Sequence, residues 1–272
     1  AAYIPAWDTW KWGLLEWDDF VNPLACGIKC AHRVTTVSTG YMQELMDNAN
    51  GLELLFREEY AKCSGIINGI DYEVWNPEQD TYVMDNYGVT DADDGKALNK
   101  KKLCDDYKLN LKLPLFVFIG RLVNEKAADL LPEAITNALI NYKGKLNFMV
   151  LGNGDPVIEK DLLAMQNKFA GNYNTSITYN EKLSHLMYAG ADFLLMPSRV
   201  EPCGLNQLYA MRYGTVPVVR NTGGLNDTVK DIAEKYGRGL CFNKASLNEI
   251  DISKERALKL CKSQNKNATH NK

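Results

Sequence analysis

The fold is decided by residues 184–229, SHLMYAGADFLLMPSRVEPCGLNQLYAMRYGTVPVVRNTGGLNDTV. Two strand-sized apolar runs, 192–197 and 216–220, are separated there by a helical segment at 205–213. Strands that alternate with helices indicate a parallel sheet with helices on both faces. Glu201 follows the first strand in a Pro/Gly loop, at the carboxyl end where open α/β sheets bind their ligands. This stretch therefore predicts both an α/β fold and a candidate site.

The same alternation extends upstream to Leu113. The predicted strands are 114–119, 146–151, 175–178, 192–197 and 216–220, and the predicted helices are 126–142, 156–169, 182–189, 205–213 and 224–235. A shorter βα unit is expected within 33–48, where Thr and Ser residues precede a helical pattern. Between them, residues 64–112 are rich in turn residues and include a helical segment at 96–107, so the domain boundary is expected in this span.

Composition excludes several classes of protein. The 272 residues are 46% hydrophobic and 24% charged, which is typical of a soluble globular chain. The formal charge is −3 and basic residues are dispersed, so the sequence gives no sign of nucleic-acid binding. Apolar runs such as 113–120 are well short of the roughly 20 residues that span a bilayer. Seven cysteines without a CxxC pair, and no secretory signal, predict a reducing cytoplasmic setting.

Cations and backbone amides stand at the predicted strand ends. Arg121 and Lys126 begin a helical segment, where positive charge is unfavourable unless an anion is bound, so they are candidates for phosphate binding. Two solvated surface charges are the alternative. The amides of Gly204, Leu205 and Asn206 open the next helix and are a second candidate phosphate site.

Two side chains are candidates for contacts with the rest of such a ligand. Tyr179 follows a short strand and offers a ring for stacking on a base, although an aromatic packed in the core is as common. Glu201 is placed to contact a sugar attached to the diphosphate, although an exposed loop glutamate near a helix is the commoner case. His185 and Tyr188 are interpreted as packing residues, and Trp75 first as a core residue and then as a sugar platform. The GxG turn at 152–154 is assigned no contact, because a lone GxG is a weak signal.

The sequence also resembles a known family. The strings GIINGIDYEVWNPEQD (65–80), GRLVNEKAADLL (120–131), LGNGDP (151–156) and the stretch 179–229 look like the glycogen and starch synthases of the bacterial type, which are retaining glucosyltransferases. The resemblance covers roughly residues 20 to 242. It implies a two-lobed double-Rossmann fold of the GT-B type, and transfer of glucose from ADP-glucose, or UDP-glucose, to the non-reducing 4-hydroxyl of an α-1,4-glucan.

The resemblance also implies roles for single residues. Arg121 and Lys126 would hold the donor diphosphate and stabilise the leaving nucleotide, and Tyr179 would stack on the base. Glu201 would contact the donor glucose, and Asn68 would reach the sugar when the lobes close. The amides of Gly204, Leu205 and Asn206 would bind phosphate. Neither a metal nor another cofactor is expected; the partners are the nucleotide-sugar donor and the glucan, and a plastid is an alternative to the cytoplasm.

Two features qualify the resemblance. Tyr209 stands where many related glycosyltransferases carry a second glutamate, which is a feature of the synthases themselves. The Lys-Thr-Gly-Gly loop of the family's amino-terminal lobe is absent from this chain. We therefore expect residues 1–77 to be the end of the acceptor-side lobe, 78–112 a connector, and 113–272 the donor lobe without its final helices. A fragment that is inactive or only binds nucleotide, and another retaining transferase of this fold, are the alternatives.

Overall fold

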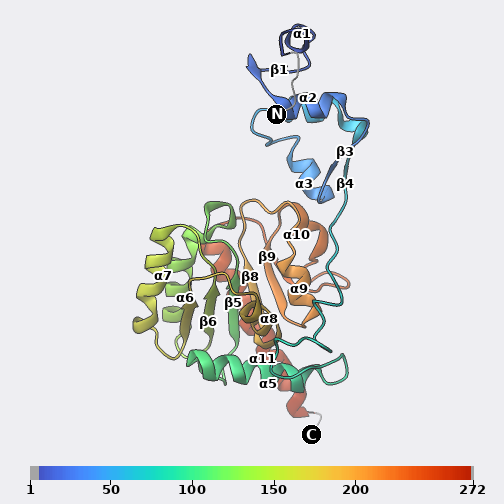
Figure 1. Cartoon of the computed structure of the whole chain (residues 1–272). Helices are drawn as coiled ribbons and strands as arrows, with labels where there is room; N and C mark the ends of the chain where they lie inside the picture. Colours follow the sequence, from blue (N-terminus) through green and yellow to red (C-terminus); the bar gives the residue numbers. More distant parts are fainter. Residues whose placement is uncertain (1–5, 271–272) are drawn as a thin grey trace. The chain divides into compact units, whose positions relative to one another are not determined.

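The computed structural model describes residues 6–270 and divides into two units, residues 1–68 and 69–272 (Figure 1). Unit 1 contains α1 (Ala6–Lys11), β1 (Glu16–Trp17), β2 (Phe20–Val21), α2 (Pro23–Cys30), β3 (Val34–Thr36), α3 (Thr39–Glu44), α4 (Glu53–Glu58), a 3-10 turn (Tyr60–Lys62) and β4 (Cys63–Gly65). β3 and β4 pair in parallel, as expected for adjoining βα units. The Asn22 and Ser38 side chains accept hydrogen bonds from the first turns of α2 and α3, which fixes where these helices begin.

Unit 2 is a six-stranded parallel sheet with helices on both faces. Its elements are α5 (Ala92–Tyr107), β5 (Leu115–Ile119), α6 (Leu131–Asn141), β6 (Asn147–Leu151), α7 (Pro156–Lys168), β7 (Tyr173–Ser176), α8 (Glu181–Gly190), β8 (Phe193–Met196), α9 (Asn206–Arg212), β9 (Val216–Arg220), α10 (Gly223–Thr228), β10 (Leu240–Phe242) and α11 (Leu247–His270). The strand order is β10-β9-β8-β5-β6-β7. The predicted α/β class is confirmed.

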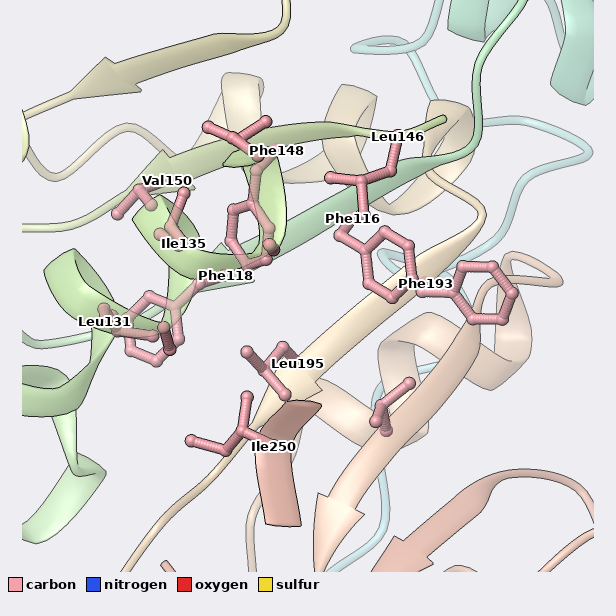
Figure 2. Close-up of a cluster of buried hydrophobic side chains, with 14 of the residues drawn as sticks. Phe116, Phe118, Leu131, Ile135, Leu146, Phe148, Val150, Phe193, Leu195 and Ile250 are labelled. Carbon is pink, nitrogen blue, oxygen red and sulfur yellow. The ribbon is translucent and has the colours of Figure 1, made fainter. Parts of the chain in front are cut away.

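Alternation along the strands builds two cores. Phe116, Phe118 and Phe148 face α6, α7 and α11, where they pack with Leu131, Ile135 and Ile250 among others (Figure 2). The intervening residues of β5, Leu115 and Val117, face the other side and pack with α5, α8, α9 and α10. The strands are apolar on both faces because both faces are covered, which explains their continuous apolar runs.

Two predicted helices differ most from the bounds in the structure. The segment predicted as helix 126–142 begins with two 3-10 turns (Asn124–Lys126 and Ala128–Leu130), because Ala127 between them is left-handed at φ 51°, and α6 starts only at Leu131. The helix predicted at 224–235 is α10, which ends at Thr228. Asp231 beyond it accepts hydrogen bonds from the amides of Ala233 and Cys241, so this segment turns back instead of continuing as helix.

Residues 69–112 belong to unit 2. The structure groups α5 and the irregular segment before it with the sheet, whereas the sequence places a domain boundary at 77/78 and a connector at 78–112. Lys96 of α5 donates hydrogen bonds to the carbonyls of Ala189 in α8 and of Ala191 directly after it. The assignment of the units as acceptor-side remnant and donor lobe stays a prediction.

Candidate active site

The order of the strands creates a crevice between β5 and β8. From β5 the chain proceeds outward through β6 to β7, and it then returns to β8 on the other side of β5 and proceeds outward through β9 to β10. The loops that leave β5 and β8 therefore diverge to opposite faces of the sheet, and ligands of open α/β sheets bind at such a point. Arg121 and Lys126 lie in the loop after β5, and Glu201 lies in the loop after β8.

Lys126 and Glu201 form an ion pair in this crevice. The Lys126 Nζ lies 2.5 Å from Glu201 Oε2, which also accepts a hydrogen bond of 3.0 Å from the Ser198 hydroxyl. Glu201 is only 5% exposed, so the alternative of an exposed loop glutamate is wrong. A buried carboxylate needs a cation or donors beside it, and Lys126 and Ser198 supply both.

Arg199 holds the two loops in register. Its guanidinium donates to both carboxylate oxygens of Asp129, at 2.5 and 2.8 Å, and to the carbonyl of Asn124 at 2.8 Å. The backbone amides of Arg199 and Val200 both donate to the carbonyl of Glu125. Since these contacts join the β5 loop to the β8 loop, they fix the two backbones from which Lys126 and Glu201 extend.

Two glycines allow a third loop to pack beneath Glu201. A Cβ atom on Gly224 would lie 2.2 Å from the carbonyl oxygen of Cys203, and one on Gly223 would lie 2.1 Å from that of Glu201. The amide of Gly224 donates to the Glu201 carbonyl at 3.0 Å. The TGGL sequence at 222–225 is thus required by close backbone approach, and it supports the loop that carries the carboxylate.

The start of α9 is fixed against the end of β5. The Asn206 side chain donates to the carbonyl of Ile119 at 2.6 Å, and Gly204 takes the left-handed φ of 71° that turns the chain into the helix. Among the residues that the structure describes, none caps the first turn of this helix with its side chain. Leu205 and Asn206 line the cavity described next.

A cavity of about 380 Å³ opens beside these loops. Arg121, Tyr179, Leu205 and Asn206 line it, so the fold brings four of the predicted site residues to one space. Aromatic rings form much of the remaining wall, and the lining also includes Trp75, Gly152, Asn153, Tyr188 and Tyr209. An apolar, aromatic pocket with a few polar groups is the usual form of a small-molecule site.

The structure brings some of the predicted site residues together and leaves others apart. Tyr179 is 81% exposed at this cavity, so the alternative of a core aromatic is wrong. Lys126 and Glu201 pair with each other in the adjoining loops, and Gly204 follows Glu201 in the same loop. Asn68 is an exposed residue at the end of unit 1 and belongs to a different unit from the cavity. The roles given to these residues stay predictions.

Sequence reasoning missed part of the wall. The GxG turn was assigned no contact, yet Gly152 and Asn153 line the cavity. Trp75 and Tyr209 stack with ring centroids 3.7 Å apart, and both face the same space. The position of Trp75 in the WNP string was the one available signal, because an aromatic in a turn-rich segment needs a packing partner elsewhere in the chain.

Comparisons with known proteins identify the family. Residues 99–269 match the family model described as glycosyl transferases group 1, and residues 1–58 match the starch synthase catalytic domain. The chain belongs to the glycogen and starch synthase family. The glycogen synthase of Flavobacterium johnsoniae is 51% identical over 258 residues, which is 95% of this chain and 54% of that protein. The glycogen synthase of Myxococcus xanthus is 41% identical over 90% of this chain and 51% of its own length.

Solved structures agree with this family membership. The catalytic domain of starch synthase IV from Arabidopsis thaliana, solved with ADP and acarbose bound, superposes with a TM-score of 0.81 at 35% identity, over 88% of this chain and 50% of that one. A glycosyltransferase from Rickettsia africae has a TM-score of 0.61 at 15% identity over 96% of this chain and 59% of that one, and shows the fold alone. The predicted GT-B fold class and family are thus confirmed, and the chain spans about half the length of the family members it matches.

Two further observations concern other kinds of site. None of the helices described between residues 6 and 270 combines the length and apolarity that a bilayer-spanning segment requires. Within the same part of the chain, no three His, Cys, Asp or Glu side chains gather as a metal site would need.

Proposed function

We propose that this protein is a glycogen or starch synthase that transfers glucose from ADP-glucose to the non-reducing 4-hydroxyl of an α-1,4-glucan, with retention of configuration. The observation that carries the proposal is the Lys126–Glu201 pair, at the switch point of the sheet and beside an aromatic cavity. The parts of a sugar nucleotide match the groups of this site. The base matches the aromatic rings, the diphosphate matches the cations Arg121 and Lys126, and the sugar matches the carboxylate of Glu201.

The leaving group is stabilised by fixed positive charge. Arg121 at the cavity and Lys126 in the crevice bind the diphosphate, and the amides of Gly204, Leu205 and Asn206 add donors from the start of α9. As the bond to glucose breaks, negative charge grows on the phosphate, and preorganised cations and amides stabilise it without rearrangement. We propose no metal and no other cofactor for this chemistry, because these groups supply the stabilisation.

Glu201 supports the glucosyl group. Without donor it is neutralised by Lys126, and a bound diphosphate shares that cation. The carboxylate is then free to interact with positive charge on the sugar as the transition state becomes oxocarbenium-like. Asn68 is proposed to contact the sugar when the lobes close.

The aromatic wall of the cavity is suited to stacking with the base of the donor. Tyr179 offers an exposed ring for stacking, and Trp75 and Tyr209 form an extended wall in a space of about 380 Å³. Stacking of a base on an aromatic side chain contributes about 1–3 kcal/mol. We propose ADP-glucose over UDP-glucose, because the similar starch synthase IV structure was solved with ADP bound. Calorimetric titrations with ADP and with UDP test this choice, and we expect the lower Kd for ADP.

The setting proposed for this reaction is the cytoplasm. All seven cysteines carry free thiols, which fits a reducing compartment. The acceptor is proposed to be the glucan chain itself.

The substitution Glu201→Gln in the full-length enzyme tests the role of the carboxylate. We expect loss of glucosyl transfer to glycogen with the Kd for ADP-glucose nearly unchanged, since the amide keeps the shape but not the charge. Glu125→Gln, which alters an exposed carboxylate in the neighbouring loop, is the matched control and keeps its activity. Full activity of the Glu201→Gln enzyme would refute the role given to Glu201.

A second measurement separates an enzyme from a module that only binds nucleotide. Calorimetry with ADP and a radiolabelled transfer assay are performed on the same 272-residue chain. If the chain both binds ADP and transfers glucose, it is active as an enzyme by itself. If it binds ADP without transfer, it is a module that only recognises nucleotide. Absence of both would contradict the proposed site.

A further inference from the structure

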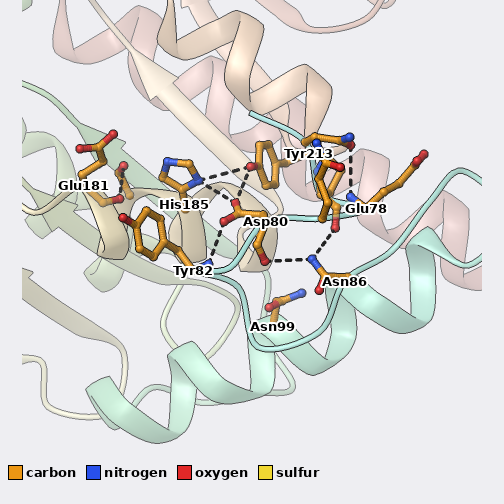
Figure 3. A network of polar contacts seen from close by, with 12 residues as sticks. Glu78, Asp80, Tyr82, Asn86, Asn99, Glu181, His185 and Tyr213 are labelled. Atoms are coloured by element: carbon orange, nitrogen blue, oxygen red, sulfur yellow. Dashed lines mark hydrogen bonds and ion pairs between the residues drawn. The ribbon is translucent and has the colours of Figure 1, made fainter. Parts of the chain in front are cut away.

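An irregular segment of unit 2 is attached to the sheet domain by buried polar contacts. Residues 71–87, called the strap here, form no helix or strand. Tyr87 donates its hydroxyl hydrogen to the carbonyl of Tyr213 at 2.8 Å, and Arg212 donates to the Asn76 side chain at 2.7 Å. Asp80 lies in the middle of the strap and is buried against α8 and the end of α9 (Figure 3). The strap is therefore held by specific contacts at several points.

Asp80 is the centre of this attachment. Its Oδ2 accepts hydrogen bonds from His185 Nδ1 at 2.6 Å and from the Tyr213 hydroxyl at 2.5 Å, and its Oδ1 accepts one from the amide of Tyr82 at 2.8 Å. Burial by itself would raise the pKa of Asp80, but the hydrogen bonds from His185, Tyr213 and Tyr82 hold that pKa below its ordinary value. The carboxylate is thus charged and fully engaged in the interior.

His185 connects this network to a stack of rings. Its imidazole lies on Trp75 with ring centroids 3.9 Å apart and an interplanar angle of 15°. Trp75 in turn lies on Tyr209, at 3.7 Å and 17°. The three rings form one stack, in which Trp75 is the middle layer, and Trp75 and Tyr209 line the cavity of the candidate site.

The position of the His185 ring has a cost that the packing alone does not explain. Its Nε2 is buried and has no hydrogen-bond partner among the described residues, although a buried polar atom normally has one. Within the part of the chain that the structure describes, Nε2 therefore stays without a partner while Nδ1 is held by its hydrogen bond to Asp80. An apolar ring in this position would avoid the cost of burying Nε2 without a hydrogen bond, but Asp80 could not orient such a ring.

We infer that Asp80 and His185 are positioning residues for nucleotide binding, which act by holding the Trp75 ring flat against Tyr209. Neither residue lines the cavity; their effect reaches the ligand through Trp75. Preorganisation of this wall removes the cost of ordering it when a base binds. The inference rests on the proposed function for the identity of the ligand, a nucleoside diphosphate.

Tyr213→Phe and Asp80→Asn test this inference, with Tyr173→Phe as the matched control. Tyr173 is also a buried tyrosine with a donated hydroxyl, to the Leu162 carbonyl at 3.2 Å, but it packs in the core on the opposite face of the sheet. Trp75 is the only tryptophan of residues 69–272, so the difference in emission between each protein and its Trp75→Phe derivative isolates its signal. All measurements are made well below the melting temperature of every variant.

We expect Asp80→Asn and Tyr213→Phe to change the Trp75 emission of the ligand-free chain and to weaken ADP binding about 2- to 10-fold, the range for loss of one aromatic pairing. Tyr173→Phe changes neither, although it also lowers stability. Unchanged Trp75 emission and ADP affinity in both network variants would overturn the inference, as would unchanged ADP affinity in the Trp75→Phe variant. If the parent chain does not bind ADP, the proposed function fails, and the ligand-free emission still decides whether the network positions Trp75.

Discussion

The stability of unit 2 should rise with pH above neutrality because of Lys96. The ammonium group of Lys96 in α5 lies inside unit 2 and donates to four oxygens, among them the Tyr213 carbonyl at 3.1 Å and the Thr215 hydroxyl at 2.9 Å. Burial lowers the pKa of Lys96 to about 7, despite the favourable charge of Asp192. In the unfolded chain the same group titrates near 10.4.

The sign follows from the protons bound in each state. Between pH 7 and 10 the unfolded chain holds a proton on Lys96 that the folded chain has largely released, so the free energy of unfolding increases as pH rises. A difference of about 3 pKa units corresponds to about 4 kcal/mol at most. Lys96 as a whole is partly exposed, and water near it reduces the effect, so we expect an increase of about 2–4 kcal/mol in the free energy of unfolding. Below pH 7 this contribution is constant.

Urea denaturation at pH 7, 8, 9 and 10, followed by far-ultraviolet circular dichroism, measures this slope. Lys96→Met is the comparison, because methionine fills a similar space without a titrating group. We expect its free energy of unfolding to change less between pH 7 and 10 than that of the parent chain, even though the variant is less stable overall. Equal slopes in the two proteins would show that Lys96 is charged in the folded state throughout this range.

Two other substitutions test how the loops and strands are held. Gly224→Ala should lower the free energy of unfolding by about 1–3 kcal/mol, because the new Cβ would lie 2.2 Å from the Cys203 carbonyl oxygen, a backbone atom that cannot move freely. Gly27→Ala in α2 is the control, since that Cβ meets nothing within 4 Å, and it should stabilise its helix by about 0.5–1 kcal/mol. Thermal melts measure both effects. Equal melting temperatures for the Gly224→Ala and Gly27→Ala variants would contradict the steric argument. Asp192→Asn should lower the free energy of unfolding by about 1–3 kcal/mol, because the carboxylate accepts hydrogen bonds from Lys100 at 2.6 Å and from the Leu115 amide at 2.7 Å. The midpoint of denaturant unfolding measures this loss. An unchanged midpoint would show that the amide oxygen of Asn replaces the carboxylate fully.

The sequence predicted the parts of the fold that depend on local pattern. Strands β5, β6, β8 and β9 were visible because both faces are buried and the apolar runs are continuous. β10 was not predicted, since three residues give too short a pattern, and α11 was not predicted because its sequence is largely polar. The apolar positions of α11 that pack on the core, such as Ile250 and Ala257, are seven residues apart and scarcely stand out.

The same distinction applies to the site. Arg121, Tyr179 and Glu201 were predicted because each follows a strand, and parallel strands bring their carboxyl ends to one edge. The burial of Glu201 was not predictable, since it depends on the β5 and TGGL loops packing around it. Trp75 was weighed as a sugar platform only after a core role, because its partner Tyr209 is 134 residues away and no local pattern links the two.

The ring stack also gives a physical reason for Tyr209, the position at which many related glycosyltransferases carry a second glutamate. Here the side chain at 209 lies flat on Trp75, and burial raises the pKa of its hydroxyl, so it stays uncharged beside the cavity. A carboxylate there would lose the stacking surface for the base and would place a negative charge in the same cavity as a nucleotide that carries a diphosphate. An aromatic residue at 209 is therefore consistent with the strap that places Trp75 against it, and the strap tryptophan and the aromatic residue at 209 should occur together. We expect Tyr209→Glu to weaken ADP binding more than Tyr209→Phe, because phenylalanine keeps the stack with Trp75.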